Sequence, residues 1–350
     1  MASPSDANQK PTDWAAGHAK APSVLFIGGT GTISAACVRE VMTLGFDVTV
    51  LNRGQSGLRP LPDGVTVLHA DLDDDQAMAA ALSGRNFDSV ADFCSYTTPR
   101  LGRNIDLLRG HVGQYIFISS ASAYQKPVAS LPITESTPLR NDFWQYSRDK
   151  IVCEDYLNNL WRSEGFPITI VRPSHTYDRF RVPMFGYWTQ VARARAGKPM
   201  VIQGDGTSLW TLTHASDFAY MFAGLVARPQ ARGEAYQIMG DEVLTWDAIA
   251  TTFAQAAGAP NARIVHVASE TIAAVMPDIS GDLLGDKAHS VVFDCSKVRA
   301  LRPGFAQKVP FWRGARDIVA TYDQHVELSV VDPTVDAALD KLVAWADSVA

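Results

Sequence analysis

The chain has 350 residues, of which 47% are hydrophobic and 19% charged, the composition of a globular protein with enough apolar material for a large core. Its formal net charge is −6 and no block of lysine and arginine stands out, which argues against a nucleic-acid surface. No apolar run approaches the roughly 18 residues that span a bilayer, the four cysteines form no CxxC pair and the histidines show no metal-ligand spacing. We therefore expect a cytoplasmic protein that needs no metal.

Residues 1–20 are polar and contain no apolar segment of the kind that a secretory signal requires. We predict that this stretch is a flexible tail. Neither a membrane nor a nucleic acid is expected as a partner, and the ligand we predict is a small molecule.

Beyond the tail, short apolar runs alternate with segments whose apolar residues recur at helical spacing. The predicted strands are 24–28, 47–52, 65–69, 89–93, 114–119 and 168–172. The predicted helices between them are 32–44, 74–83, 98–110 and 142–164. Strands that are apolar throughout are typical of a parallel sheet with helices on both faces, so residues 21–173 are predicted to form a doubly wound α/β domain that binds a nucleotide.

After Pro173 the regular alternation ends. A loop rich in aromatic residues and arginine leads into a predicted helix over 186–196, and Thr245 is the predicted N-cap of a helix over 246–258. We expect residues 174–350 to form mainly a smaller C-terminal lobe that binds the substrate, with some segments returning to the first domain.

The turn after the first predicted strand has the sequence GGTGTIS, at residues 28–34. Gly28 permits a tight turn, and Gly31 has no Cβ, so the backbone can approach a diphosphate closely. The helix that follows directs free N–H groups and the positive end of its dipole toward such an anion. Ser34 takes the third position, where glycine is usual. The residues of this turn that we predict to bind the cofactor are Gly28, Thr30, Gly31, Thr32 and Ile33.

The end of the second predicted strand bears on the choice between NAD and NADP. An NAD site usually carries an acidic residue there to bind the ribose hydroxyls, whereas this chain has Asn52 and Arg53. Because no carboxylate repels a 2′-phosphate and a guanidinium can pair with one, we predict NADP, with NAD as the alternative. A solvated loop arginine is the simpler interpretation of Arg53. After the third strand, Asp71 is predicted to bind adenine or to cap the next helix, and Leu72 to pack on the adenine ring.

A tyrosine and a lysine, Tyr146 and Lys150, are four residues apart in FWQYSRDK and therefore share one face of a predicted helix. The fifth predicted strand ends in FISSAS, which places Ser119, Ser120 and Ser122 at the carboxyl edge of the sheet, where folds of this kind bind ligands. A phenol with its ordinary pKa of about 10 is a poor base at neutral pH. We predict that the Lys150 ammonium lowers the pKa of Tyr146 and that a serine hydroxyl holds the substrate oxygen during hydride transfer.

Six segments together resemble one known family: GGTGTIS (28–34), HADLDD (69–74), FISSASAY (117–124), YSRDK (146–150), VRPSHTYD (171–178) and GDGTSLWTLTHASDFA (204–219). The family is that of the extended short-chain dehydrogenase/reductases, which include NAD(P)-dependent sugar epimerases and dehydratases. The resemblance implies a Rossmann-type fold. It further implies that Tyr146 and Lys150 are the catalytic pair, that Ser120 or else Ser122 is the catalytic serine, and that Pro173 and Ser174 contact the nicotinamide.

The chain also departs from that family's motifs. Where its 4,6-dehydratases carry an Asp-Glu pair, this chain has Ala121 and Ser122, which disfavours dehydration. Where its nucleotide-sugar epimerases place an arginine for the diphosphate, this chain has Trp210, whose indole can stack on a sugar or pack between the lobes. Nucleotide sugars are not excluded, because four other arginines could bind the anion: Arg179, Arg181, Arg193 and Arg195.

Several side chains of the second half of the chain are further candidates. Tyr177, Phe185 and Trp188 are predicted either to line the substrate pocket or to lie in the core. His175 is expected to make a polar contact in the substrate loop, and His214 is expected to be structural.

Three functions remain open on this evidence. The first is an NAD(P)-dependent epimerase that oxidises and re-reduces one carbon of a sugar, a sugar nucleotide or a similar small molecule. The second is a simple NADP-dependent carbonyl reductase or alcohol dehydrogenase. The third is a cofactor-sensing or RNA-associated protein on the same fold, which the presence of both Tyr146 and Lys150 disfavours. As in relatives, we expect a homodimer that pairs through the helices at 98–110 and 142–164.

Overall fold

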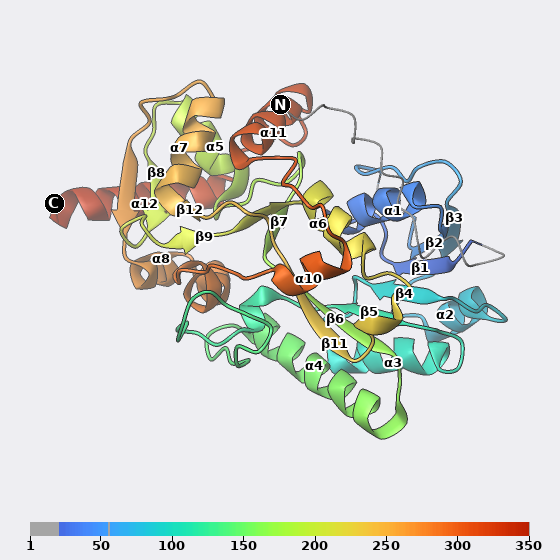
Figure 1. Ribbon diagram of the computed structural model, residues 1–350. Coiled ribbons are helices and arrows are strands. Elements are labelled where there is room, and N and C mark those ends of the chain that lie inside the picture. Colours follow the sequence, from blue (N-terminus) through green and yellow to red (C-terminus); the bar gives the residue numbers. More distant parts are fainter. Residues whose placement is uncertain (1–20, 55–56, 350) are drawn as a thin grey trace, which may run out of the picture.

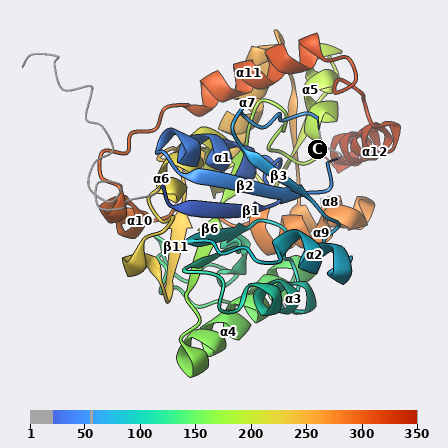
Figure 2. The same ribbon diagram turned by 90° about the vertical axis from the view of Figure 1, so that its right-hand side faces the viewer.

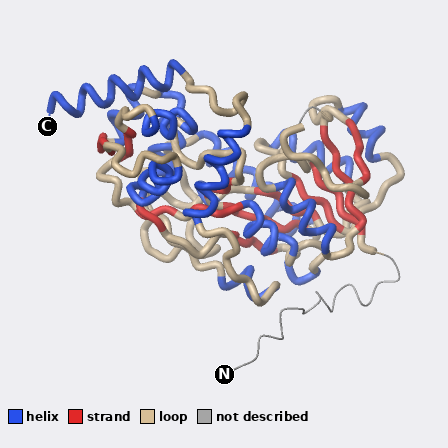
Figure 3. The backbone as a smooth tube through the Cα atoms, turned by 90° about the horizontal axis from the view of Figure 1, so that it is seen from above, coloured by secondary structure: helices blue, strands red, loops and turns tan. Residues whose placement is uncertain are grey.

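The computed structural model describes residues 21–54 and 57–349, so the predicted tail at 1–20 lies outside the described residues. Figure 1 shows one large sheet with its helices and, beside it, a lobe built mostly from the second half of the chain. Viewed from above, the main strands run side by side in one half of the molecule, and the helix that ends the chain projects from the other half (Figure 3).

The main sheet has seven strands, all parallel, in the order β11-β6-β5-β4-β1-β2-β3. This confirms the predicted doubly wound α/β fold. Each predicted strand is present within three residues of its predicted ends. The seven strands are β1 (Ser23–Ile27), β2 (Asp47–Asn52), β3 (Thr66–His69), β4 (Ser89–Asp92), β5 (Tyr115–Ile118), β6 (Ile168–Pro173) and β11 (Glu234–Ile238).

Helices cover both faces of this sheet. Figure 2 shows α1 (Ser34–Thr43) and α6 (Ala215–Ala223) on one face, and α2 (Asp75–Leu82), α3 (Thr98–Leu108) and α4 (Gln145–Glu164) on the other. The two faces contain separate hydrophobic cores, and alternate residues of each strand enter them: Val24 and Phe26 of β1 face α1, whereas Leu25 and Ile27 face α2 and α3. Apolar side chains are therefore buried on both faces, which explains why apolar and polar residues do not alternate along the strands.

The chain returns to this sheet after it has entered the second lobe. Strand β11 pairs in parallel with β6 and forms the edge of the sheet, and α6 packs beside α1. The seventh strand was not predicted, because Glu234–Ile238 follows a long irregular segment and its partner β6 is some sixty residues earlier.

The second lobe is built from small two-stranded sheets and surrounding helices. Strands β7 (His175–Tyr177) and β10 (Leu212–His214) pair in parallel, as do β8 (Met200–Gln203) and β13 (Ile264–Val267), whereas β9 (Leu209–Trp210) and β12 (Leu244–Thr245) are antiparallel. The helices are α5 (Tyr187–Arg195), α7 (Trp246–Ala256), α8 (Ser269–Val275), α9 (Ser280–Asp282), α10 (Ser296–Leu301), α11 (Phe311–Gln324) and α12 (Pro333–Val349). Short 3₁₀-helices lie at Ala121–Ala123, Pro229–Ala231 and Pro277–Ile279, and a π-helix spans Leu283–Lys287.

Local side-chain contacts set several helix ends. Thr245 caps α7 as predicted, because its hydroxyl accepts a hydrogen bond from the backbone N–H of Ala248 at 3.0 Å. Helix α4 begins at Gln145, three residues later than predicted. The Asn141 side-chain oxygen binds the N–H groups of Phe143 and Trp144 and keeps both outside the helix. Within the described residues, no helix has the length and apolarity that crossing a membrane requires.

Candidate active site

A cleft runs along the carboxyl edge of the main sheet. Its larger cavity, about 780 Å³, lies over the ends of β1, β5 and β6. A smaller cavity of about 310 Å³ lies over the end of β2. The two cavities share four lining residues and form one continuous cleft: Gly28, Thr30, Cys94 and Tyr96. In parallel α/β sheets, ligands bind in the crevice outside this edge.

The glycine turn between β1 and α1 lies where the two cavities meet. Gly28 has φ +85, and a Cβ there would lie 2.2 Å from the Cys94 sulfur, so only glycine fits. The backbone N–H of Gly31 donates to the Ser34 hydroxyl at 2.9 Å, which shows that Ser34 closes the turn where glycine is usual. The first turn of α1 has no acidic residue and no side-chain cap. Its N–H groups and dipole thus favour an anion beside Gly31, Thr32 and Ile33, all of which line the larger cavity.

The smaller cavity is lined by all four residues predicted for the adenosine end, namely Asn52, Arg53, Asp71 and Leu72. Arg53 has no ion-pair partner among residues 21–54 and 57–349. Asp71 accepts a hydrogen bond from the N–H of Asp73 at 3.0 Å. The cap of α2 is Asp74, whose carboxylate binds two N–H groups of the first turn, so the alternative that Asp71 caps this helix is wrong. With a turn that suits a diphosphate beside it, this end has the form that a dinucleotide requires.

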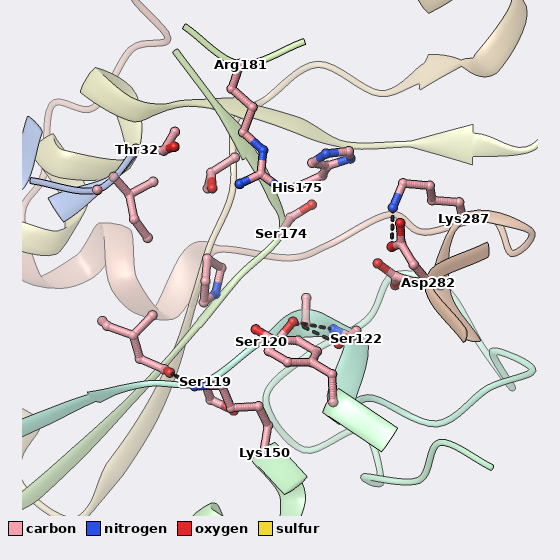
Figure 4. A pocket seen from close by; sticks show the side chains of 18 of the residues that line it. Thr32, Ser119, Ser120, Ser122, Lys150, Ser174, His175, Arg181, Asp282 and Lys287 are labelled. Atoms are coloured by element: carbon pink, nitrogen blue, oxygen red, sulfur yellow. Dashed lines mark hydrogen bonds and ion pairs between the residues drawn. The ribbon is translucent and has the colours of Figure 1, made fainter. Parts of the chain in front are cut away.

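Ser120, Tyr146 and Lys150 all line the larger cavity, together with the nicotinamide candidates Pro173 and Ser174. Tyr146 and Lys150 come from successive turns of α4, and Ser120 directly follows β5. Figure 4 shows Ser120, Ser122 and Lys150 on one side of the cavity and Arg181 on the opposite side. The structure thus brings the predicted catalytic side chains into the same cavity as the glycine turn.

The serines form a chain of hydrogen bonds that ends at Ser120. The Ser147 hydroxyl donates to the Ser122 hydroxyl at 2.7 Å, and the Ser122 and Ser120 hydroxyls are 2.9 Å apart. Since Ser122 accepts from Ser147, it can donate its own proton to Ser120. Ser122 is 2% exposed, so Ser120 is the serine that can offer a proton to the cavity. A hydrogen bond from Ser120 favours the phenolate of Tyr146.

The predicted effect of Lys150 on Tyr146 is wrong for this structure. Burial, and then the nearby Tyr96, raise the pKa of Tyr146 to about 12, and the contribution of Ser120 is too small to reverse this. The Lys150 ammonium donates instead to the carbonyl oxygens of Ser95 and Ile118, each at 2.7 Å, and lies 5.9 Å from the Tyr146 ring centre. Burial lowers the pKa of Lys150 to about 8, partly opposed by the charge of Asp92. Tyr146 therefore holds its proton at neutral pH.

A buried carboxylate fixes one of the two carbonyls that bind Lys150. Asp92 lies at the end of β4 with no exposed surface. It accepts hydrogen bonds from the Ser95 N–H at 2.9 Å, the Ser95 hydroxyl at 2.6 Å, the Tyr115 hydroxyl at 2.5 Å and the Asn104 amide at 3.1 Å. These bonds hold the segment after β4 in the position from which the Ser95 carbonyl meets Lys150.

A buried ion pair holds α4 against the sheet. Arg172 of β6 donates to both carboxylate oxygens of Glu154, with a shortest distance of 2.6 Å, and both residues are at most 5% exposed. The Ser119 hydroxyl donates to the same carboxylate at 2.5 Å, so Ser119 is structural. Because Glu154 is one helical turn beyond Lys150, this pair sets how far α4 lies from the cavity.

The second lobe contributes the wall of the larger cavity that we call the far wall. It includes three of the predicted substrate residues: His175, Phe185 and Trp210. The Trp210 indole N–H donates to Nδ1 of His175 at 3.3 Å, so the ring proton of neutral His175 is on Nε2. Burial, followed by the charges of Lys287 and Arg181, holds the pKa of His175 well below its ordinary value. His175 is therefore a neutral side chain at neutral pH.

Two predicted substrate residues lie outside the lining of the cavity. Tyr177 is 1% exposed and packs against the rings of His214 and Phe311, with centroids 5.2 and 5.7 Å away. Trp188 stacks on Tyr322 at 4.6 Å. Both are core residues, so their predicted substrate contact is corrected. His214 caps α6 through Nδ1, which is the structural role expected of it.

One segment of the wall was missed in the sequence. Asp278, Asp282 and Asp286 line the cavity from the helical stretch that ends in the π-helix, together with Lys287, which pairs with Asp282. These three aspartates are four residues apart and therefore lie on one face of a helix. That spacing is the sequence pattern from which a shared acidic face could have been predicted. Nothing in the sequence links them to Tyr146. Tyr96 and Trp144, also in the lining, carry no comparable signal.

Comparisons with known proteins show what the chain is similar to. A model of the NAD dependent epimerase/dehydratase family matches residues 24–238. The 2′-dehydrokanamycin reductase of Streptomyces kanamyceticus is 26% identical over 293 residues, which are 81% of this chain and 80% of the reductase. The chloroplast stem-loop binding protein of 41 kDa b of Arabidopsis thaliana is 28% identical over 255 residues, 69% of this chain and 65% of that protein.

Solved structures show the same fold. The UDP-glucose 4-epimerase of Bifidobacterium longum, in complex with NAD+ and UDP, superposes with a TM-score of 0.69 at 19% identity, covering 88% of this chain and 100% of that one. An epimerase of Methanothermobacter thermautotrophicus gives a TM-score of 0.71 at 17% identity, over 88% and 94% of the two chains. At these identities the likeness establishes the architecture alone.

Proposed function

The chain belongs to the NAD dependent epimerase/dehydratase family, and from that premise we propose that it is an NADP(H)-dependent oxidoreductase that reduces a ketone of a carbohydrate-like substrate to the alcohol, or the reverse. The observation that carries the proposal is the convergence of Ser120, Tyr146 and Lys150 in the same cavity as the glycine turn. A surface tyrosine–lysine pair would not lie beside a site for a diphosphate. Bound in this cleft, a reduced nicotinamide supplies the hydride.

The side chains of the site suit the delivery of a proton. Ser120 would hold the substrate oxygen, and Tyr146, protonated at neutral pH, would donate its proton as negative charge develops there. The Ser120 proton is then engaged by the substrate oxygen, and the cation near the phenolate so formed is the Lys150 ammonium, whose nitrogen lies 5.9 Å from the centre of the Tyr146 ring. A phenol that keeps its proton can donate it to the oxygen of a carbonyl that is being reduced.

We assign the cofactor as NADP(H) because of Arg53. Its guanidinium lines the adenosine end of the cleft and is without an ion-pair partner among the described residues. No acidic residue stands at the end of β2, where NAD sites place one for the ribose. A 2′-phosphate would provide the missing partner for Arg53.

For the substrate we propose a polyhydroxylated ring. Trp144, whose ring lies 4.7 Å from that of Tyr146, can pack on the apolar face of a sugar, and Asp282 and Lys287 across the cavity can bind hydroxyls. The reductase of Streptomyces kanamyceticus, by its name, acts on 2′-dehydrokanamycin, which is consistent with such a substrate.

The test is an assay of the purified protein with NADPH and a panel of keto sugars, in which the reduced nicotinamide is followed by its absorbance. We expect consumption of NADPH in proportion to the alcohol formed. A second candidate, an epimerase, is favoured by the structural neighbours that carry that name. It would convert a sugar to its epimer without net consumption of NADPH, so the ratio of product to oxidised cofactor separates the two functions.

An RNA-binding role is the remaining candidate, because one relative is named a chloroplast stem-loop binding protein. If this chain acted only in that way, the variant Tyr146→Phe would bind RNA as the wild type does and neither protein would reduce any keto sugar. That result would contradict the proposed function.

We also propose a homodimer that pairs through α3 and α4. On α4, Val152 is 53% exposed and could be covered by a partner subunit. Light scattering after size-exclusion chromatography measures the mass directly, and a monomer would contradict this part of the proposal.

A further inference from the structure

We propose that Arg181 is an anion-binding residue of the cleft, which holds a phosphate or carboxylate group of a ligand opposite Ser120 and Tyr146. The proposal rests on the proposed function for the identity of the cleft. Arg181 lines the larger cavity, and Figure 4 shows its guanidinium extending into that cavity from the loop after β7.

Contacts of the four candidate arginines single out Arg181. Arg193 is buried and binds the carboxylates of Asp336 and Asp340. Arg195 pairs with Asp323. Arg179 and Arg181 are both exposed, but Arg179 lies over the Phe180 ring, 4.7 Å from its centre, and of the two only Arg181 lines the cavity.

The guanidinium of Arg181 has no carboxylate partner within the described ranges 21–54 and 57–349. A neighbouring cation of the cavity, Lys287, is already paired with Asp282, and the Lys150 ammonium is held by two backbone carbonyls. Arg181 is exposed, so its guanidinium is available to a ligand that enters the cavity.

The loop that carries Arg181 is held in place by an ion pair between distant segments. Arg59, between β2 and β3, donates to both oxygens of Asp178 at 2.5 and 2.9 Å. Asp178 also accepts from the backbone N–H of Phe180, and its carbonyl accepts from the N–H of Arg181 at 3.1 Å. The backbone of Arg181 is thus fixed by residues that have no place in the cavity themselves, which is the support that a specific binding group needs.

A second donor lies near Arg181. Neutral His175 carries its ring proton on Nε2 because Nδ1 accepts from Trp210, and the charge of Arg181 acts on His175. The charge of Arg181 also acts on Tyr146 and Tyr96. The anion would therefore lie within electrostatic reach of the reacting carbon, where a cation and a neutral N–H together match a phosphate or a carboxylate.

Two molecules could supply this anion: the substrate and the diphosphate of the cofactor. The experiment compares the wild type with Arg181→Gln, Arg181→Lys and the matched control Arg179→Gln, whose guanidinium is two residues away and outside the cavity. One titration measures the affinity for NADPH by its fluorescence. The other measures the affinity of the NADP+-saturated protein for inorganic pyrophosphate by calorimetry, since the glycine turn is then covered.

If the substrate supplies the anion, Arg181→Gln weakens pyrophosphate binding by about tenfold to a hundredfold and leaves NADPH binding within about twofold. If the cofactor supplies it, the same variant weakens NADPH binding by that factor. In either case Arg181→Lys recovers part of the affinity and Arg179→Gln matches the wild type.

The proposal is overturned if Arg181→Gln binds both ligands as the wild type does, or if Arg179→Gln loses as much affinity. A wild-type protein that binds neither NADPH nor NADH would instead contradict the proposed function. If the protein binds neither nucleotide, pyrophosphate is titrated into the protein without cofactor. An equal affinity of wild type and Arg181→Gln for pyrophosphate would then overturn the proposal that Arg181 binds an anion.

Discussion

The two ends of the cleft differ in the groups that line them: the diphosphate site of one end is backbone, and the other end is lined by side chains. The cofactor end is made mostly by consecutive elements between β1 and α2, with Cys94, Tyr96 and Arg100 added after β4. Its diphosphate site is backbone: the turn at Gly28, the bare Cα of Gly31 and the N–H groups of α1. The substrate end collects side chains from β5, α4, the loop after β7 and the segment that ends in the π-helix. The cofactor end should therefore be sensitive to changes in backbone shape, and the substrate end to changes in single functional groups.

The largest effect is expected at the substrate end, from Tyr146→Phe. Loss of the proton donor should lower kcat by about a hundredfold to ten-thousandfold, with NADPH affinity unchanged, because the hydroxyl is needed for the reaction and not for the diphosphate. The control Tyr156→Phe changes a tyrosine of the same helix that is absent from the cavity lining. Steady-state kinetics and NADPH titration measure both quantities, and equal losses in the two variants would remove the distinction between the two ends.

The next effect concerns the ion pair that fixes the distance between α4 and the sheet. Glu154→Ala leaves Arg172 buried without its partner and should lower the free energy of unfolding by about 3–5 kcal/mol. The matched control is Glu234→Ala, which breaks the exposed pair with Lys297 and should cost about 1 kcal/mol or less. Urea denaturation measures both values. Similar costs for the two pairs would show that Glu154 does not anchor α4.

At the cofactor end, the proposed preference for NADPH over NADH is assigned to Arg53. Arg53→Gln should weaken NADPH binding by about tenfold to a hundredfold and leave NADH binding unchanged, since only NADPH carries the 2′-phosphate. Arg85→Gln, on the surface after α2, is the control. Fluorescence titration provides the affinities, and a wild-type preference for NADH would show that the cofactor is NAD.

The last effect is seen only above neutral pH, in the pH profile. The pKa of Lys150 is lowered to about 8 by burial, so its ammonium is lost as the pH rises through that value. Activity that depends on this cation should fall by about tenfold per pH unit above pH 8, whereas Tyr146, with a pKa of about 12, keeps its proton. A rate that stays constant to pH 10 would show that the charge of Lys150 is not needed.

The lowered pKa of Lys150 also affects stability. Activity is expected to fall as the pH rises, whereas stability is expected to increase. Between a folded pKa of about 8 and the ordinary value of 10.5, the unfolded chain binds more protons at Lys150 than the folded chain does. The free energy of unfolding therefore gains a contribution as the pH rises across this window.

The contrast between the two ends also explains what the sequence alone could predict. The glycine turn, Arg53 and Asp71 lie within fifty residues of one another and are tied to strand ends, so a local pattern was enough to place them. The tyrosine and lysine of α4 were found in the same way, through their helical spacing.

Local patterns failed where distant segments meet. Burial within the assembled core decided that Tyr177 and Trp188 pack inward, and burial also reversed the predicted acidity of Tyr146. The residues of the far wall, Asp282 and Lys287 among them, reach the cavity only after the second lobe has folded against α4. Hydrophobic periodicity carries no information about contacts between distant segments. It shows which face of a helix or strand is buried, but not which other element covers that face.

A labelled hydride tests the proposed reaction most directly. Wild-type protein and Tyr146→Phe would each be incubated with NADPH carrying deuterium at the transferable position of the nicotinamide and a panel of keto sugars, and the products analysed by mass spectrometry. We expect one deuterium on the new alcohol carbon with the wild type, and with Tyr146→Phe the same product at a rate lower by about a hundredfold or more. Products without deuterium, or equal rates for the two proteins, would contradict the proposed reaction.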